Sequence, residues 1–183
     1  MGPGEGTRPL GDRVKQTLFA ILEPAIRGQP FLDLFAGSGS AGIEALSRGA
    51  SAAVFVESDR NAVRAIQRNL EATGLAGSAA VVSDRSVGGW LAKVGRGAGP
   101  FSAIVVDPPY DARAELNRTL AGIADAGRGA ILAADGIVVA KHFWRDPPEG
   151  NRLLRSVRQE RFGETALSFY RWADEDASQG VAS

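Results

Sequence analysis

The sequence predicts a single α/β domain built on a doubly wound, mostly parallel sheet. Apolar segments of strand length alternate with amphipathic segments of helix length along most of the chain. A chain of 183 residues matches one domain in size, and no internal repeat or second apolar core is evident. Near the C-terminus, two strand-like segments flank Gly163-Glu164, which indicates a closing hairpin.

The first half of the chain predicts an opening helix and three strands that alternate with helices. Helices are expected at 12–23, 40–48 and 59–74, where apolar residues recur on one face. Asp12 and Asp59 suit N-caps, and Gly49 and Gly74 suit helix ends. Strands are expected at 31–35, 52–57 and 79–83.

The second half continues this alternation and then changes to strands alone. A short helix at 86–93 and a loop at 95–100 are expected before the strand that ends at Val106. A helix at 114–126 precedes a strand at 137–141, and the hairpin strands are expected at 153–162 and 166–172. The three tryptophans are expected to pack in the core or at its rim: Trp90, Trp144 and Trp172.

Composition excludes several kinds of site. The chain has no cysteine and one histidine, His142, so disulfides, thiolate nucleophiles and ordinary zinc sites are not expected. His142 is expected on the surface at a strand end, and contact with an RNA phosphate or base is the alternative interpretation. The net charge of zero counts against a surface that coats nucleic acid, and the arginines at 152, 155, 158 and 161 are interpreted as solvated. Without a signal-peptide pattern or a long apolar run, we expect a cytoplasmic protein that does not cross a membrane.

The segment Asp107-Pro108-Pro109-Tyr110 follows an apolar strand and is the most informative motif in the chain. Each proline biases the residue before it towards extended backbone, and neither proline has an N–H group. The segment therefore offers mainly acceptors, namely the Asp107 carboxylate and a proline carbonyl, beside an aromatic ring. Two acceptors and a stacking face suit an amino group on a flat nitrogen-bearing ring. An ordinary proline-rich turn is the alternative interpretation.

A glycine-rich turn after the first strand predicts a nucleotide site. Gly37, Gly39 and Gly42 form the pattern Gly-x-Gly-x-x-Gly, which lets the backbone turn tightly and approach a ligand. Glu57 ends the next strand, where a carboxylate can accept hydrogen bonds from ribose hydroxyls. An ordinary strand-end acid is the alternative interpretation of Glu57.

Asp33 helps to distinguish a dinucleotide from S-adenosylmethionine. A carboxylate inside the first strand, close to the glycine-rich turn, suits an ammonium or sulfonium group better than a pyrophosphate. Asp84, at the end of the third strand, could accept from the adenine amino group, with Arg85 on or near the ring. These positions favour S-adenosylmethionine.

Two motifs resemble those of class I S-adenosylmethionine-dependent methyltransferases. Asp33 through Gly39 resembles their glycine-rich loop, and the tetrapeptide at 107–110 resembles that of members that methylate exocyclic amino groups. More narrowly, RPLGDRVKQTLF at 8–19, FAGSG at 35–39 and EALSRGA at 44–50 resemble the RsmD family over about residues 8–172. The resemblance implies a Rossmann-like fold with a seven-stranded sheet whose last strand is antiparallel.

The RsmD family methylates the N2 amino group of a guanine in bacterial 16S ribosomal RNA, so the resemblance implies this reaction with S-adenosylmethionine and without a metal. The expected catalytic residues are Asp107, Pro108, Pro109 and Tyr110. The expected cofactor-binding residues are Asp33, Phe35, Ala36, Gly37, Ser38, Gly39, Glu57, Ser58, Asp84, Arg85 and Asp107. The expected RNA-binding residues are Arg8, Arg13, Lys15, Lys141 and Arg145.

The N-terminal region departs from the family pattern. Family members usually have threonines where this chain has Leu10 and Gly11, and a basic extension usually precedes the Arg-Pro pair. Here seven residues precede Arg8, and none is basic. We therefore expect weak binding to naked RNA and a substrate within an assembling or assembled small subunit. The expected organisation is a monomer with a flexible leader (1–7), a methyltransferase domain (8–172) and a flexible acidic tail (173–183).

Other functions stay open at this point. An amino-group methyltransferase for DNA adenine would share the tetrapeptide, but such enzymes usually need a target-recognition region for which this chain has no room. A non-catalytic adenosine-ligand or RNA-binding module would keep the fold without needing the intact tetrapeptide. A nicotinamide-dependent dehydrogenase would have no use for that tetrapeptide.

Overall fold

The computed structural model describes residues 11–174, apart from residues 78 and 94. The expected leader at 1–7, Arg8 and the tail from 175 onward lie outside the described residues. The helices are α1 (Asp12–Ile26), α2 (Ser40–Ser47), α3 (Arg60–Ala72), α4 (Val87–Lys93), α5 (Gly95–Ala98) and α6 (Arg113–Asp125). The strands are β1 (Pro30–Leu34), β2 (Ala52–Val56), β3 (Ala80–Ser83), β4 (Phe101–Val106), β5 (Leu132–Phe143), β6 (Leu154–Phe162) and β7 (Thr165–Trp172).

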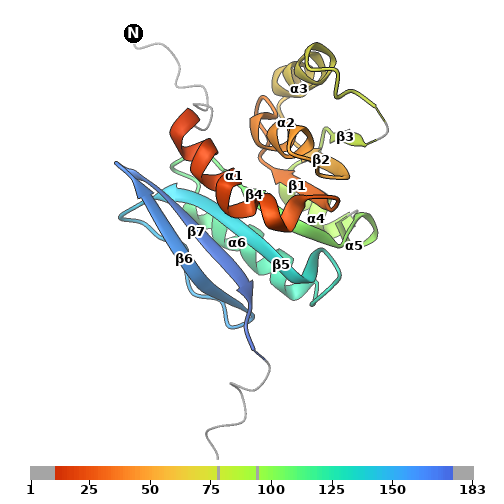
Figure 1. Cartoon of the computed structure of the whole chain (residues 1–183). Helices are drawn as coiled ribbons and strands as arrows, with labels where there is room; N and C mark the ends of the chain where they lie inside the picture. The colour runs from red at the N-terminus through yellow and green to blue at the C-terminus, as the bar shows by residue number, and fades with distance from the viewer. Residues whose placement is uncertain (1–10, 78, 94, 175–183) are drawn as a thin grey trace, which may run out of the picture.

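The strands form one sheet in the order β3-β2-β1-β4-β5-β7-β6 (Figure 1). Strands β1 to β5 pair in parallel, whereas β7 is antiparallel to both β5 and β6. The chain first extends the sheet from β1 to β3 and then returns to the other side of β1 with β4. This topology confirms the predicted doubly wound sheet with an antiparallel last strand.

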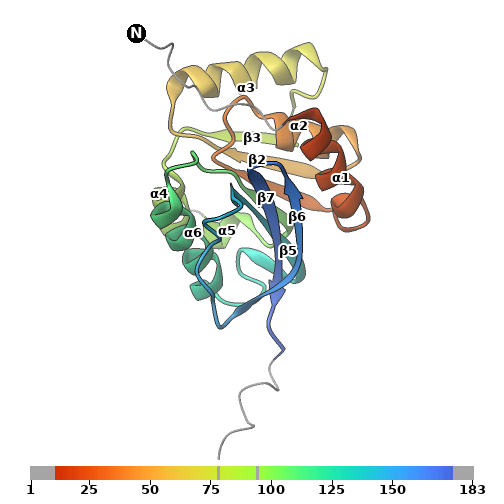
Figure 2. The same ribbon diagram turned by 90° about the vertical axis from the view of Figure 1, so that its left-hand side faces the viewer.

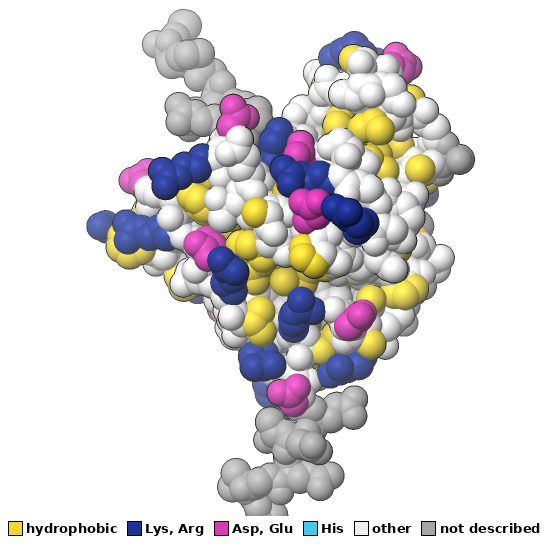
Figure 3. All heavy atoms as spheres, viewed as in Figure 1, with side chains coloured by type: hydrophobic (Ala, Val, Ile, Leu, Met, Phe, Trp, Pro, Cys, Tyr) yellow, Lys and Arg dark blue, Asp and Glu magenta, His cyan; other side chains and the backbone are white. Residues whose placement is uncertain are grey.

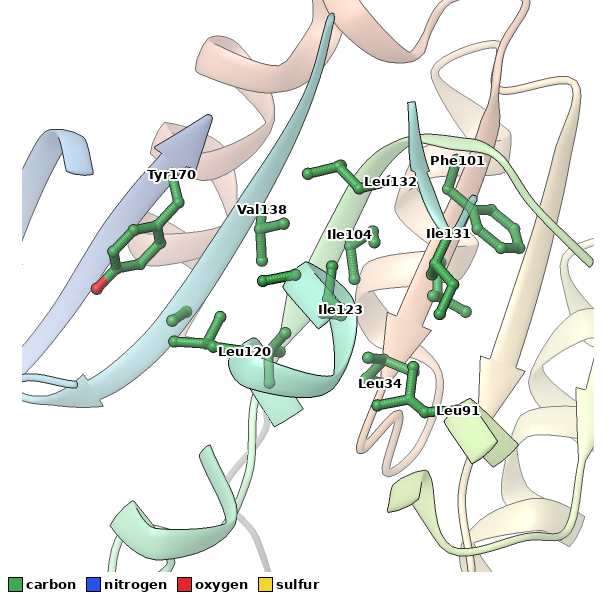
Figure 4. Close-up of a cluster of buried hydrophobic side chains, with 14 of the residues drawn as sticks. Leu34, Leu91, Phe101, Ile104, Leu120, Ile123, Ile131, Leu132, Val138 and Tyr170 are labelled. Atoms are coloured by element: carbon green, nitrogen blue, oxygen red, sulfur yellow. The ribbon is translucent and has the colours of Figure 1, made fainter. Parts of the chain in front are cut away.

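Helices cover both faces of the sheet (Figure 2). On one face, α1 and α2 pack on β1, β4, β5 and β7 through a buried cluster that includes Leu18, Phe19 and Phe31. Ile66 and Leu70 of α3 pack on β2 on the same face. On the opposite face, α4 and α6 cover the sheet through a larger apolar cluster (Figure 4). Burial on both faces explains why the central strands read as continuous apolar runs.

The helix boundaries differ from expectation at α1. Gly11 occupies the N-cap position, so Asp12 lies in the first turn, where its negative charge faces the positive end of the helix dipole. The helix continues past Pro24 to Ile26, three residues beyond the expected end. Buried Leu22 and Ile26 hold this last turn against the core, although Pro24 has no N–H to donate. At α3, Asp59 is the predicted N-cap, and its Oδ1 accepts from the Ala62 N–H at 2.8 Å.

Two other segments also differ. Residues expected to form a loop include the helical turn α5, and β5 begins at Leu132 rather than at 137. The early part of β5 was missed because Ala133, Ala134, Asp135 and Gly136 are poor strand formers and interrupt the apolar run. In the structure its pairing with β4 is irregular between Phe101 and Ala103. The arginines at 155, 158 and 161 lie exposed on the edge strand β6, as expected for solvated side chains. No helix in the described part of the chain has both the length and the apolar character to cross a membrane.

Candidate active site

The sheet brings the predicted motifs together at the carboxyl ends of three neighbouring strands. Strand β1 lies between β2 and β4, and Leu34 is paired with Val56 on one side and Val106 on the other. The residues that follow these three positions are Phe35, Glu57 and Asp107. This is the point where the strand order reverses, and doubly wound proteins bind ligands in the crevice beyond such a point.

Backbone conformation and side-chain contacts fix the glycine-rich turn. Phe35, Gly37 and Gly39 have φ angles of 59°, 56° and 83°, in the left-handed region. The Gly37 N–H donates to Glu57 Oε2 at 2.8 Å, so the carboxylate at the end of β2 holds the turn. From α3, the Asn69 side-chain amide donates to the Ser38 carbonyl at 3.0 Å. Sequence reasoning missed this contribution of Asn69, because no local pattern links α3 to the turn.

Gly42 lets helix α2 pack closely on β2. A Cβ atom at this position would lie 2.2 Å from Cε1 of the Phe55 ring, which is completely buried. The Gly42 N–H also donates to Asp33 Oδ2 at 2.9 Å. The third glycine of the pattern therefore serves helix–sheet packing, and it anchors the buried carboxylate of β1.

Three carboxylates lie close enough at this edge to affect one another electrostatically. Asp33 is 2% exposed, and burial raises its pKa well above the ordinary value. The hydrogen bond from Gly42 opposes this shift, whereas the negative charges of Asp107 and Glu57 add to it. Such a group of carboxylates favours a cationic ligand. The ammonium and sulfonium groups of S-adenosylmethionine are cations of this kind.

Asp107 forms an ion pair that sequence reasoning missed. Its Oδ1 lies 2.9 Å from Lys141 Nζ, and the two side chains are 20% and 11% exposed. Burial raises the pKa of Asp107, and the Lys141 ammonium opposes that shift. The strand register explains the contact, because Val106 pairs with Ala140 and the next residue of each strand is therefore adjacent. Lys141 was expected to contact RNA. Its ammonium lies within the site, and the RNA contact stays a prediction.

Tyr110 is held from two sides but stays accessible. Its hydroxyl hydrogen-bonds with the Thr165 hydroxyl at the start of β7, and Lys141 Nζ lies 5.4 Å from the ring centroid. The side chain is nevertheless 54% exposed, so a ring face is available for stacking. Residues beside it line a hollow at the ends of β4 and β5: Pro108, Pro109, Arg113, Lys141, His142 and Phe143.

The remaining predicted cofactor residues lie around the same edge. Asp84 and Arg85 follow β3 and are exposed, and Ser58 is exposed directly after Glu57. The Glu57 N–H donates to the Ser83 carbonyl at 3.1 Å, which brings the ends of β2 and β3 together. Ligand contacts of these residues stay predictions.

The predicted RNA-binding residues differ in exposure and in their partners. Arg13 is exposed on α1, and Arg145 is exposed beyond β5. Lys15 Nζ lies 3.9 Å from a Glu44 carboxylate oxygen. Together with Ser38, Lys15 and Glu44 line a cavity of about 290 Å³. Arg8 lies outside the described residues.

The expected surface position of His142 is wrong. The side chain is 6% exposed, and its Nε2 lies 2.8 Å from the Ser168 hydroxyl of β7. Its Nδ1 lies 2.7 Å from the Phe143 carbonyl, and burial lowers the pKa of the imidazole. The antiparallel strand β7 covers this position, which sequence alone did not show. The expected packing of the tryptophans is confirmed, since Trp90 and Trp172 are buried and Trp144 is half-buried.

Comparisons with known proteins agree with this geometry. The family model described as Conserved hypothetical protein 95 matches residues 1–171. YlbH of Bacillus subtilis is 36% identical over 169 residues, which cover 92% of this chain and 89% of YlbH. The chain belongs to the RsmD family of methyltransferases. The family predicted from the three motifs is therefore confirmed.

Other members and neighbours of the RsmD family extend the comparison. Ribosomal RNA small subunit methyltransferase D of Escherichia coli K12 is 43% identical over 122 residues, which cover 67% of this chain and 59% of that protein. The solved structure of yhhF from E. coli has a TM-score of 0.79 at 31% identity and covers 90% of this chain and 88% of its own.

A more distant structure shows likeness of fold alone. An RNA methyltransferase from Salinibacter ruber, solved with S-adenosyl-L-homocysteine, has a TM-score of 0.70 at 14% identity. The alignment covers 92% of this chain and 95% of that one. The predicted class I methyltransferase fold is therefore confirmed over nearly the whole chain.

Proposed function

We propose that this protein transfers a methyl group from S-adenosylmethionine to the exocyclic N2 amino group of a guanine in bacterial 16S ribosomal RNA. The observation that carries the proposal is the position of Asp107-Pro108-Pro109-Tyr110 beside the carboxylates of Asp33 and Glu57. An acceptor segment for an amino group thus adjoins a site suited to a cationic adenosine compound. The name of the E. coli relative supports ribosomal RNA as the substrate.

The cofactor would lie across the carboxyl ends of β1, β2 and β3. When bound, S-adenosylmethionine supplies an activated methyl group on a positively charged sulfur. Glu57 keeps lone pairs for the ribose hydroxyls, because each oxygen accepts one backbone N–H, from Gly37 and Asp59. The residues that would hold the cofactor are Asp33, Phe35, Ala36, Gly37, Ser38, Gly39, Glu57, Ser58, Asp84, Arg85 and Asp107.

Asp107 and Pro108 would orient the amino group. An aromatic amine is a poor nucleophile because its lone pair is delocalised into the ring. Acceptors at the Asp107 carboxylate and the Pro108 carbonyl would hold the two hydrogens and favour the pyramidal nitrogen of the transition state. Burial raises the pKa of Asp107, and the Lys141 ammonium opposes that shift, so the ion pair favours the accepting carboxylate.

Tyr110 would stack on the guanine and direct its nitrogen towards the methyl group. The base must be unpaired or extruded from a helix, because otherwise its amino group lies within a stack. Alignment of the reacting atoms would supply much of the acceleration, a proximity effect worth up to about 7–11 kcal/mol. The proton released from the product can pass to water, through Asp107.

The RNA would be held mainly by shape and by a few cations. The proposed contacts are Arg8, Arg13, Lys15, Lys141 and Arg145. Because the net charge is zero, few phosphates would be neutralised and naked RNA would bind weakly. We therefore propose that the substrate is RNA within an assembling or assembled small subunit, and that the protein acts as a monomer in the cytoplasm.

Transfer of labelled methyl to ribosomal RNA tests this function. Free 16S RNA, small subunits lacking the modification and unmethylated DNA are each incubated with the protein and labelled S-adenosylmethionine, and the nucleosides are then analysed. We expect N2-methylguanosine, mainly from the particle. The Asp107→Asn protein is the matched control. Methyl on adenine of DNA, with none on ribosomal RNA, would reject the ribosomal substrate.

A further inference from the structure

At the end of the β6–β7 hairpin, Arg161 of β6 stacks with Trp144 and Arg145, which directly follow β5. The Arg161 guanidinium carbon lies 3.5 Å from the centroid of the Trp144 ring, and the Arg145 guanidinium carbon lies 4.8 Å from it. Both arginines are exposed, whereas Trp144 is half-buried. We call these three residues the guanidinium stack. Figure 3 shows Lys and Arg side chains along the side of the molecule that β6 and β7 form.

The guanidinium stack adjoins the candidate active site. Its residues Trp144 and Arg145 fall between Phe143 and Asp146, which both line the hollow beside Tyr110. The backbone N–H of Trp144 donates to the backbone carbonyl of Glu164 in the hairpin turn at 2.9 Å. The next residue of the chain is Thr165, which holds the Tyr110 hydroxyl. The same hairpin end therefore fixes both the stack and the Tyr110 ring.

The two positive charges of the guanidinium stack favour binding of an anion. Two guanidinium groups beside one indole repel each other, and within residues 11–174, leaving aside 78 and 94, neither forms an ion pair. Arg161 Nε donates to the Gly163 carbonyl at 2.9 Å, and among the same described residues its terminal N–H groups make no hydrogen bond. The acidic residues nearby are Asp146, which pairs with Arg113, Glu160, which pairs with Arg158, and the exposed Glu164.

We propose that the guanidinium stack binds the phosphodiester backbone of the RNA strand next to the target nucleotide. A guanidinium group presents its N–H donors in a planar fork that matches phosphate oxygens. The indole of Trp144 holds these planes and so reduces the freedom lost on binding. Such phosphate contacts set the register of a strand without reading its sequence. The inference rests on the proposed RNA substrate and extends its contact surface to Arg161 and Trp144.

Salt-dependent RNA binding tests the guanidinium stack. The probe is a short, single-stranded oligoribonucleotide of mixed sequence, and the proteins are the Arg145→Gln, Arg161→Gln and doubly substituted variants. The matched control is Arg68→Gln, an exposed arginine of α3, which packs beside β3 at the edge of the sheet opposite to β6. Each stack substitution should weaken binding and make the negative slope of log K against log salt shallower by roughly 0.7, the value for one lost phosphate contact on a single strand. The control should change neither quantity, and Arg161→Lys should keep the slope while it weakens binding.

The results of these binding experiments can reject the phosphate contact independently of the proposed methyl-transfer reaction. A doubly substituted protein with unchanged affinity and salt slope would overturn the proposal, as would absence of RNA binding by the unaltered protein at low salt. If the doubly substituted protein does not fold, the two single variants decide. If the slopes change as expected but no methyl reaches ribosomal RNA, the reaction is wrong and the phosphate contact stands.

Discussion

Asp107 Oδ1 lies 2.9 Å from Lys141 Nζ at the carboxyl ends of two neighbouring parallel strands. Burial of both side chains favours the neutral acid, whereas the ammonium favours the carboxylate. The pair therefore keeps an acceptor in a largely dry place, at the position where the proposed reaction needs one.

The first prediction concerns Asp107 itself. In Asp107→Asn, methyl transfer should fall at least about a hundredfold, roughly 2.7 kcal/mol of barrier, because the strong acceptor is lost. Affinity for S-adenosylhomocysteine, measured by calorimetry, should change much less. The substitution also leaves Lys141 buried and unpaired, so a second protein with Lys141→Met added should recover stability without recovering activity. Normal turnover by Asp107→Asn would remove Asp107 from the mechanism.

The second prediction concerns pH and Asp33. Because burial raises its pKa well above the ordinary value, the folded protein binds a proton there more readily than the unfolded chain does. The contribution of this group to stability therefore grows as pH falls towards the ordinary carboxyl pKa and declines as pH rises through the raised one. Asp33→Asn keeps an oxygen for the Gly42 N–H and buries no charge. It should be more stable than the unaltered protein near pH 7.

Denaturant titrations check this prediction near pH 7 and again at about pH 4, where an ordinary carboxyl begins to protonate. The difference in the free energy of unfolding between the two proteins should shrink at the lower pH. A difference that does not vary with pH would mean that Asp33 does not titrate as its burial indicates. Affinity of Asp33→Asn for S-adenosylmethionine should fall on the order of tenfold or more, because a charge-assisted contact is lost.

The third prediction concerns Glu57. The Glu57→Ala change should weaken S-adenosylmethionine binding by on the order of 1.5–3 kcal/mol, because the turn loses its anchor at Gly37 and the ribose loses an acceptor. Glu57→Gln, which keeps one carbonyl oxygen, should have an intermediate affinity. Calorimetry measures both. Unchanged affinity of the alanine variant for S-adenosylmethionine would contradict the proposed contact between Glu57 and the ribose.

The fourth prediction compares two glycines. Gly42→Ala would drive a methyl group into the Phe55 ring, so we expect a loss of about 1–3 kcal/mol in the free energy of unfolding from overpacking. At Gly88 in α4, a Cβ atom would meet nothing within 4 Å. Gly88→Ala should therefore be neutral or stabilising by up to about 0.5–1 kcal/mol. Equal stabilities of the two variants would contradict the packing role of Gly42.

The fifth prediction concerns the hydroxyl contact of Tyr110. Tyr110→Phe and Thr165→Val should each lower kcat for methyl transfer by about fivefold, close to the 1 kcal/mol typical of a hydrogen bond. Affinity for S-adenosylhomocysteine should stay the same. Because both changes remove one contact, the double variant should be little slower than either single variant. Full additivity would show that the two hydroxyls act separately.

The sequence predicted the parts of the site that follow from strand ends. The expected strands end at Phe35, at Glu57 and directly before Asp107, and the handedness of strand–helix–strand connections leaves few possible orders for the strands. Their meeting at one edge was therefore predictable. The N-cap at Asp59 and the hairpin at Gly163-Glu164 are local features, and both are confirmed.

The contacts that were missed depend on register between distant segments. Lys141 meets Asp107, and Thr165 meets Tyr110, only because β5 pairs with both β4 and β7 in the observed register. The burial of His142 has the same origin, since β7 supplies the hydroxyl of Ser168 that partners its ring. Periodicity within a segment carries no information on such pairing.

The placement of β1 between β2 and β4 ties ligand binding to cooperative folding. The loop after β1 and the acid after β2 come from the first half of the chain, whereas Asp107 arrives only when the second half pairs with the far edge of β1. A local unfolding event that separates β4 from β1 would therefore disassemble the site and expose the apolar core at the same time. A ligand that spans the two halves should resist that opening, raising the melting temperature with a stabilisation of about 2.7 kcal/mol at a hundred times its Kd.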